Sequence, residues 1–168
     1  QFDEWYGYIS DGLFQTQEEV DNSPKLNNNV TVGDIKYKDI SGPDGVPDGK
    51  ISSEYDRVLL GGSLPRYMFG VNFSASYKGF DFSMMFQGVG SQNSRISRNM
   101  IEGLNTNWGG FPSILEGDYW SSNNTAAENA GVKYPRLTRN SVDANMSMSD
   151  YWMFNGRYLR MKNLTVGY

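Results

Sequence analysis

The chain has 168 residues, enough for one compact domain by length, with 14% aromatic residues and a formal net charge of −4. It contains neither cysteine nor histidine, which excludes disulfides, thiolate catalysis, cysteine-based zinc sites and the commonest general base at neutral pH. The balance of 15 Lys plus Arg against 19 Asp plus Glu argues against nucleic acid, whose binding requires a basic surface. We therefore expect neither an enzyme nor a nucleic-acid-binding protein.

Residues 1–66 form a long polar segment rich in Gly, Asn, Ser and Asp. Residues Gln1 to Glu4 lack the basic start and apolar core of a signal peptide, so we expect the chain to begin inside a larger protein or after processing. The composition is typical of an extended loop region rather than of regular elements.

Residues 39–56 of this segment are the stretch that most resembles a binding site. Several glycines and prolines allow sharp turns, and six oxygen-bearing side chains could converge on Ca²⁺, which takes about six to eight oxygen ligands. The spacing does not match the EF-hand pattern. The alternative is a turn cluster whose carboxylates cap backbone amides. The candidate calcium ligands are Asp39, Ser41, Asp44, Asp48, Glu54 and Asp56.

Residues 67–88 carry the strongest pattern in the chain. Apolar residues occupy every second position from Tyr67 to Tyr77, and they do so again from Phe80 to Phe86 after Lys78-Gly79. Alternation with a period of two predicts two strands, and the two residues between them predict an antiparallel hairpin with a tight turn at 78–79.

Two interpretations of this hairpin compete. In the first, the apolar face packs on the core of a soluble domain. In the second, the hairpin spans a membrane with its apolar face toward lipid, its polar face toward a lumen and aromatic residues at both interfaces. Membrane strands have about 9–11 residues. Tyrosines at both ends of the apolar face favour the membrane interpretation.

Residues 89–156 form a second long polar segment, and residues 157–168 resume the alternation as the start of a third strand. Outer-membrane barrels have short periplasmic turns and long extracellular loops, so we expect the turn at 78–79 to be periplasmic and residues 1–66 and 89–156 to be extracellular. Compact soluble domains seldom have such long connections. The predicted fold is all-β: antiparallel transmembrane β-barrel strands with long extracellular loops.

Aromatic residues in these loops are the candidate substrate contacts, because sugars stack on aromatic faces while polar groups fix their orientation. The alternative is that the same residues pack the loops together. The candidates are Trp108, Phe111, Tyr119, Trp120, Tyr151 and Trp152.

A series of short motifs runs in order along nearly the whole chain. They are Gly7–Glu19, Gly33–Asp39 with the acidic loop and Asp56-Arg57 after it, Phe69–Phe73, Gly79–Asp81, Phe86–Gly88, Tyr119-Trp120, Lys133–Leu137 and Gly156–Leu164. In this order, the motifs resemble the C-terminal part of SusC/RagA-type TonB-dependent outer-membrane transporters. The acidic loop is longer than the family's usual D-x-N-G-D-G form.

This resemblance implies a nutrient importer: a large β-barrel in the outer membrane of Gram-negative Bacteroidota, with an N-terminal plug inside it. A SusD-like lipoprotein captures glycans or peptides outside the cell, and TonB drives import through the plug. The chain is then a partial barrel in contact with outer-membrane lipid, with the plug and its TonB-contacting segment upstream and further strands after Tyr168. The alternative is a soluble secreted β-domain that binds glycan or calcium.

Overall fold

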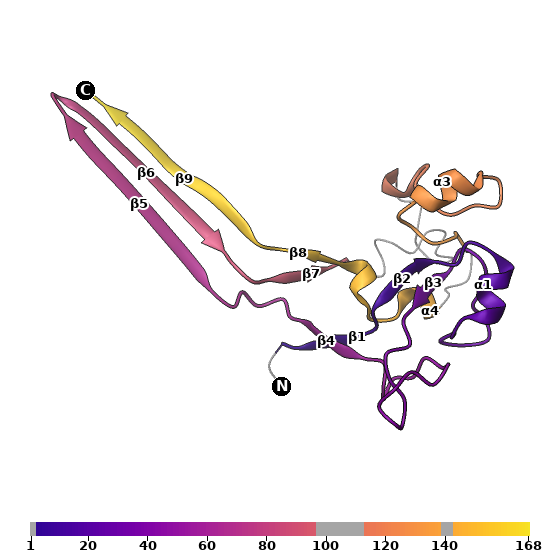
Figure 1. The fold of residues 1–168 in the computed structure, drawn as a ribbon. Coiled ribbons are helices and arrows are strands. Elements are labelled where there is room, and N and C mark those ends of the chain that lie inside the picture. Colours follow the sequence, from indigo (N-terminus) through magenta and orange to yellow (C-terminus); the bar gives the residue numbers. More distant parts are fainter. Residues whose placement is uncertain (1–2, 97–112, 139–142) are drawn as a thin grey trace, which may run out of the picture. The chain divides into compact units, whose positions relative to one another are not determined.

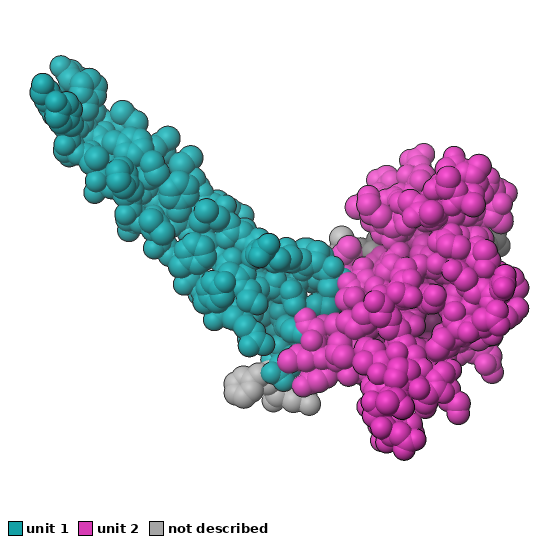
Figure 2. All heavy atoms as spheres, in the orientation of Figure 1, with its two compact units in different colours: residues 1–5, 61–95, 153–168 teal, residues 6–60, 96–152 magenta. Residues whose placement is uncertain are grey.

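The computed structural model describes residues 3–96, 113–138 and 143–168. Strands predominate and the helices are short, which confirms the predicted all-β fold. The chain separates into two compact units (Figure 2): unit 1 comprises residues 1–5, 61–95 and 153–168, and unit 2 comprises residues 6–60 and 96–152. In the described ranges, no helix has the length and apolar character needed to cross a bilayer.

Unit 1 is built around a three-stranded antiparallel sheet (Figure 1). Its strands are β5 (Met68–Tyr77), β6 (Phe80–Val89) and β9 (Tyr158–Gly167), in the order β5-β6-β9. The short strands β7 (Asn93–Arg95) and β8 (Met153–Asn155) pair with each other. The strands β1 (Trp5–Gly7) and β4 (Val58–Gly61) pair in a further two-stranded sheet, most of whose residues belong to unit 2.

A two-residue turn connects β5 to β6, and Tyr77 pairs with Phe80 across it. Lys78 and Gly79 both have positive φ, at 48° and 88°. Two successive positive φ values are the mark of a type I′ turn, whose twist matches the right-handed twist of the flanking strands. The turn therefore lies where the apolar residues change from odd-numbered to even-numbered positions in the sequence.

A β-bulge in β9 brings its apolar residues into register with those of β6. Asn163 pairs with Met85 and Met161 pairs with Phe86, so Lys162 is an extra residue without a partner on β6. An inserted residue shifts the alternation by one position. Because of this shift, one face of the sheet receives Leu159, Met161, Leu164 and Val166.

Unit 2 also contains a small antiparallel sheet and several short helices. This sheet consists of β2 (Ser10–Leu13) and β3 (Ile35–Tyr37). The helices are α1 (Gln17–Asn22), η1 (Ser113–Leu115), α3 (Ala126–Gly131), α4 (Asp143–Met146) and η2 (Asp150–Trp152).

Two clusters of buried side chains form the core of unit 2. Tyr8, Leu13, Ile35, Tyr37, Ile51 and Trp152 make the first cluster, and Phe14, Val20, Val30 and Ala144 make the second. The sequence suggested extended loops here because these apolar residues are widely spaced and follow neither a helical nor a strand period. Residues far apart in the sequence nevertheless pack together.

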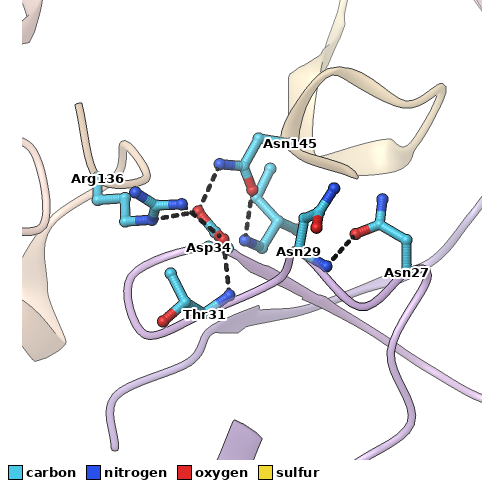
Figure 3. A network of polar contacts seen from close by, with 7 residues as sticks. Asn27, Asn29, Thr31, Asp34, Arg136 and Asn145 are labelled. Carbon is cyan, nitrogen blue, oxygen red and sulfur yellow. Dashed lines mark hydrogen bonds and ion pairs between the residues drawn. The ribbon is translucent and has the colours of Figure 1, made fainter. Parts of the chain in front are cut away.

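A buried carboxylate links three segments of unit 2 (Figure 3). The side chain of Asp34 is fully buried and accepts hydrogen bonds from Arg136 Nε at 2.8 Å, Asn145 Nδ2 at 2.9 Å and the backbone N–H of Thr31 at 2.9 Å. The Asn145 Oδ1 atom accepts a hydrogen bond from the backbone N–H of Ile35 at 2.8 Å. A buried charge is tolerated only when it is paired in this way, so the network fixes the positions of these segments.

Candidate functional site

One face of the β5–β6–β9 sheet, called the apolar face below, is apolar along its whole length. Phe73 pairs with Met84, which pairs with Leu164, and similar apolar rows lie above and below this one. Phe73 and Leu164 are 53% and 52% exposed. The members of the apolar face are Phe69, Val71, Phe73, Ala75 and Tyr77 on β5, Phe80, Phe82, Met84 and Phe86 on β6, and Leu159, Met161, Leu164 and Val166 on β9.

The opposite face, called the polar face below, carries hydroxyl, amide and charged groups. Both faces of β5 and β9 are solvent-exposed over most of their length. Met85 lies among these polar groups, and Met68, Val89 and Tyr158 form an apolar row at the end of this face remote from the turn. The members of the polar face are Met68, Gly70, Asn72, Ser74 and Ser76 on β5, Asp81, Ser83, Met85, Gln87 and Val89 on β6, and Tyr158, Arg160, Asn163, Thr165 and Gly167 on β9.

Aromatic rings border the apolar face near the turn. The rings of Phe80 and Tyr168 lie 4.7 Å apart, and the Lys78 ammonium nitrogen lies 5.3 Å from the centre of the Tyr77 ring. A tyrosine ring beside a lysine is the arrangement expected where apolar surface gives way to a polar medium.

Aromatic rings also cover glycines at the end of the sheet remote from the turn. A Cβ atom at Gly88 would lie 2.3 Å from the Phe69 ring, and one at Gly90 would lie 1.9 Å from the Tyr67 ring. Only glycine leaves room for rings at this distance. The apolar face therefore has aromatic residues at both ends.

The acidic loop is organised around Asp56 and not around a shared central position. Asp56 is fully buried, and its carboxylate accepts hydrogen bonds from the backbone N–H groups of Ile40 at 2.8 Å, Ser41 at 3.2 Å and Ser52 at 2.7 Å. Burial raises the pKa of Asp56, but the hydrogen bonds from Ser52, Ile40 and Ser41 together outweigh it and hold the pKa below 3.8. This carboxylate therefore holds the backbone at Ile40 and Ser41 next to the backbone at Ser52.

The other candidate calcium ligands are dispersed along the loop. Asp39 Oδ2 accepts a hydrogen bond from the Gly49 N–H at 2.6 Å, and Asp48 Oδ1 accepts one from the Lys50 N–H at 3.0 Å. The other two carboxylate candidates, Asp44 and Glu54, are exposed. Over the described residues, no group of three acidic side chains is arranged to hold a metal ion. This geometry fits the turn-cluster alternative, and calcium binding stays a prediction.

The aromatic candidates have different environments. Trp108 and Phe111 lie outside the described residues. Trp152 is 3% exposed, and its indole nitrogen donates a hydrogen bond to the Asn145 carbonyl at 2.7 Å. Its side chain thus belongs to the core, as the packing alternative states.

Tyr119 and Trp120 are half-buried. Tyr119 forms an isolated bridge with Tyr134. The ring of Trp120 packs so closely on Gly33 that a Cβ there would lie 2.5 Å from it, and its Nε1 atom donates a hydrogen bond to Gln15 Oε1 at 3.3 Å. The Trp120 ring therefore contributes to packing, and substrate contact by either residue stays a prediction.

Tyr151 is the candidate that lines a groove in unit 2, with a volume of about 640 Å³. Its hydroxyl donates a hydrogen bond to the Lys133 carbonyl at 2.7 Å, and burial, followed by the nearby Asp118, raises its pKa. The sequence analysis missed the other groove residues, because no local pattern connects positions more than a hundred residues apart. They are Asp11, Gly12, Leu13, Gln15, Glu19, Asn129, Ala130, Val132 and Lys133.

Two curated proteins are similar to this chain over nearly its whole length. TonB-dependent receptor P26 of Formosa agariphila is 33% identical over 158 residues, which cover 94% of this chain and 14% of the relative. TonB-dependent receptor P3 of the same organism is 26% identical over 164 residues, which cover 98% of this chain and 15% of the relative. The chain therefore spans about a seventh of the length of the curated relatives that it matches.

No protein-family model matches the chain, and no solved structure matches it significantly. The two similarities support a place for this chain among the TonB-dependent receptors. Both relatives are named as receptors and not as enzymes, which agrees with the expectation that this chain is not an enzyme.

Proposed function

We propose that this chain is part of a SusC/RagA-type TonB-dependent importer in the outer membrane of a Gram-negative bacterium of the Bacteroidota. The similarity to two TonB-dependent receptors supports the general assignment. The order of the SusC/RagA-like motifs along the chain supports the type. The remainder of the barrel, the plug and the segment that meets TonB belong to other parts of such a protein.

The two-faced β5–β6–β9 sheet is the observation that carries this proposal. Each of its three strands has ten residues, which at about 3.3 Å per residue span about 33 Å. Tilted by about 40°, as strands are in outer-membrane barrels, they cross about 25 Å, which is the height of the apolar band of such barrels. The apolar face then meets lipid, and the polar face meets the lumen.

In this arrangement, unit 2 is the extracellular part of the chain. A SusD-like surface lipoprotein is its proposed partner, and glycans or peptides are the proposed cargo. The groove beside Tyr151 offers one aromatic ring, two carboxylates, amides and an ammonium group, a combination that suits hydroxyl- or amide-rich ligands.

Lysine substitutions at two neighbouring positions test the membrane assignment. In the full-length receptor, Phe73→Lys places a charge on the apolar face, whereas Ser74→Lys places the same charge on the polar face. At the middle of a bilayer, a lipid-facing lysine costs about 2–4 kcal/mol. We expect Phe73→Lys to reduce the amount of assembled receptor in outer-membrane fractions several-fold and Ser74→Lys to leave it near wild type.

Equal tolerance of the two substitutions, together with a receptor that stays soluble without detergent, would contradict the proposal. That result would favour the alternative, a soluble secreted β-domain that binds glycan or calcium. In such a domain, the apolar face packs on protein.

A further inference from the structure

The polar face of the sheet is positively charged along β9. Arg160 lies on this face opposite Gln87, and its guanidinium carbon is 5.1 Å from the centre of the Tyr158 ring. Lys162 follows two positions later at the bulge, and because successive side chains alternate, its place directly after Met161 of the apolar face puts it on the polar face beside Asn163. Both cations are exposed, and neither forms an ion pair with any described residue.

The acidic residue of the sheet, Asp81, is too distant to neutralise these charges. It lies next to the turn, where its carboxylate accepts a hydrogen bond from Ser76 Oγ at 2.6 Å. Gln87, the partner of Arg160, is six positions farther along β6, or about 20 Å away. That distance exceeds the screening length of about 8 Å at physiological ionic strength. No acidic side chain of the three strands therefore neutralises the two cations.

Between the turn and the apolar row of Met68, Val89 and Tyr158, the polar face has the composition of a hydrated lining, with Met85 as the exception. Ser74, Ser83 and Thr165 form one row across the three strands, and Asn72, Met85 and Asn163 form the next row. The centre of a protein–protein interface is instead rich in aromatic and apolar anchors and poor in charge. Anion-selective pores carry Arg and Lys among polar groups, and residues facing a barrel lumen tune its selectivity.

We propose that this face favours anionic cargo: Arg160 and Lys162 attract a solute bearing carboxylate, sulfate or phosphate groups into the passage that the polar face lines. The inference rests on the proposed function, because the polar face meets a lumen only if the apolar face meets lipid. It adds a substrate class, since neutral glycans and neutral peptides gain nothing from the two cations.

The lack of cysteine in the chain allows a direct test by thiol labelling. In the full-length receptor, with any cysteines elsewhere replaced by serine, Met85→Cys places a thiol opposite Asn163 and beside the bulge. The measurement is the ratio of labelling rates for an anionic sulfonatoethyl and a cationic trimethylammonioethyl methanethiosulfonate in isolated outer membranes. We expect this ratio to exceed that of free cysteine.

Removal of the two charges should then lower the ratio. In the Met85→Cys background, Arg160→Gln with Lys162→Gln should reduce it by about five- to tenfold, because two charges roughly 7 Å away act with opposite sign on the two reagents. Each single substitution should give about half of this effect on a logarithmic scale. An unchanged ratio in the double variant overturns the inference.

Phe73→Cys tests the membrane assignment independently, because its thiol lies on the apolar face. Neither charged reagent should label it in membranes. Rapid labelling of Phe73→Cys overturns the proposed function. A different outcome is an unreactive Phe73→Cys together with a ratio of anionic to cationic labelling rates at Met85→Cys that is the same with and without the two charges. That result overturns the anion inference alone.

Protection experiments identify what occupies the face. A sulfated dextran oligomer should slow the labelling of Met85→Cys by an uncharged methanethiosulfonate. A neutral dextran oligomer of equal length should not slow it. In the double variant, the sulfated oligomer should no longer protect the thiol. A thiol that is unreactive toward every reagent would show that protein covers the face, and it would overturn the inference. Equal protection by both oligomers would also overturn it.

Discussion

In unit 2, Phe14, Ile35 and Leu115 are each 1% exposed, whereas in the sheet of unit 1 Phe73 and Leu164 are 53% and 52% exposed. Each square ångström of apolar surface left in water forgoes about 25 cal/mol of stabilisation, and soluble monomers seldom expose large contiguous apolar patches. The difference shows that unit 2 excludes water with its own core. The sheet instead requires an apolar medium or partner from outside.

Polar groups divide between the units in the opposite way. Unit 2 buries Asp34 within a hydrogen-bonded network, while the sheet leaves Arg160 and Lys162 exposed on its polar face. Buried ionic groups must be satisfied within the protein, whereas exposed ones are satisfied by water. Unit 2 therefore has the organisation of a folded domain, whereas the sheet has one apolar and one largely polar exposed face.

Truncation of one phenylalanine in each unit gives the largest expected difference in the free energy of unfolding, and it tests the contrast between the two units directly. Phe14→Ala removes a fully buried ring and should lower the free energy of unfolding of unit 2 by about 3–5 kcal/mol. Phe73→Ala should change it little when the chain is measured in detergent, since no core surrounds Phe73. Thermal unfolding followed by tryptophan fluorescence reports mainly unit 2, which contains Trp120 and Trp152, whereas Trp5 belongs to unit 1. Similar losses for both variants would contradict the contrast.

Loss of the buried carboxylate comes next. Asp34→Ala leaves the Asn145 amide and the Thr31 N–H without their acceptor and Arg136 without its counter-ion, which should destabilise unit 2 by about 3 kcal/mol. The control is Asp11→Ala, whose ion pairs with Lys36 and Lys38 are exposed and worth less than about 1 kcal/mol. Equal midpoints of thermal unfolding for the two variants would refute a structural role for the network.

The smallest effect is a pH dependence of the acidic loop. The folded-state pKa of Asp56 is below 3.8, so its stabilisation is fully present above the unfolded pKa and is lost as the pH falls through the folded value. Amide hydrogen exchange at Ile40, Ser41 and Ser52 should therefore accelerate, relative to intrinsic rates, as the pH falls below about 4. Asp56→Asn should show weaker protection at neutral pH and no acid transition. Equal protection of the wild type and Asp56→Asn at every pH would contradict this prediction.

Strand positions and the tight turn could be predicted because they depend on neighbouring residues. Alternation with a period of two marks β5 and β6, and Lys78-Gly79 supplies the two residues of the turn. In β9, the alternation was readable after Lys162 only, because the bulge changes its phase. Pairing with β6 reveals that change, since register is a property of two strands.

For the site candidates too, the sequence showed what depends on neighbouring residues and not what depends on distant segments. Residue types suggested that Asp56 and Trp152 face solvent or a ligand, yet both are buried and hydrogen-bonded within unit 2. Tyr151 lines a groove with Gln15 and Lys133, and no local sequence pattern relates these residues. Burial depends on which distant segments pack together, and single-sequence periodicity contains no information on that packing.

By itself, the sequence determined the all-β class, the two faces of the hairpin and the absence of cysteine and histidine chemistry, because each depends on composition or on spacing over a few residues. Tertiary structure alone decided that the polar segments form a core, that Asp34 joins Arg136 to Asn145, and that the apolar residues of β9 align with those of β6. These features arise from contacts between residues far apart in the chain, where hydrogen bonding and burial outweigh local preference.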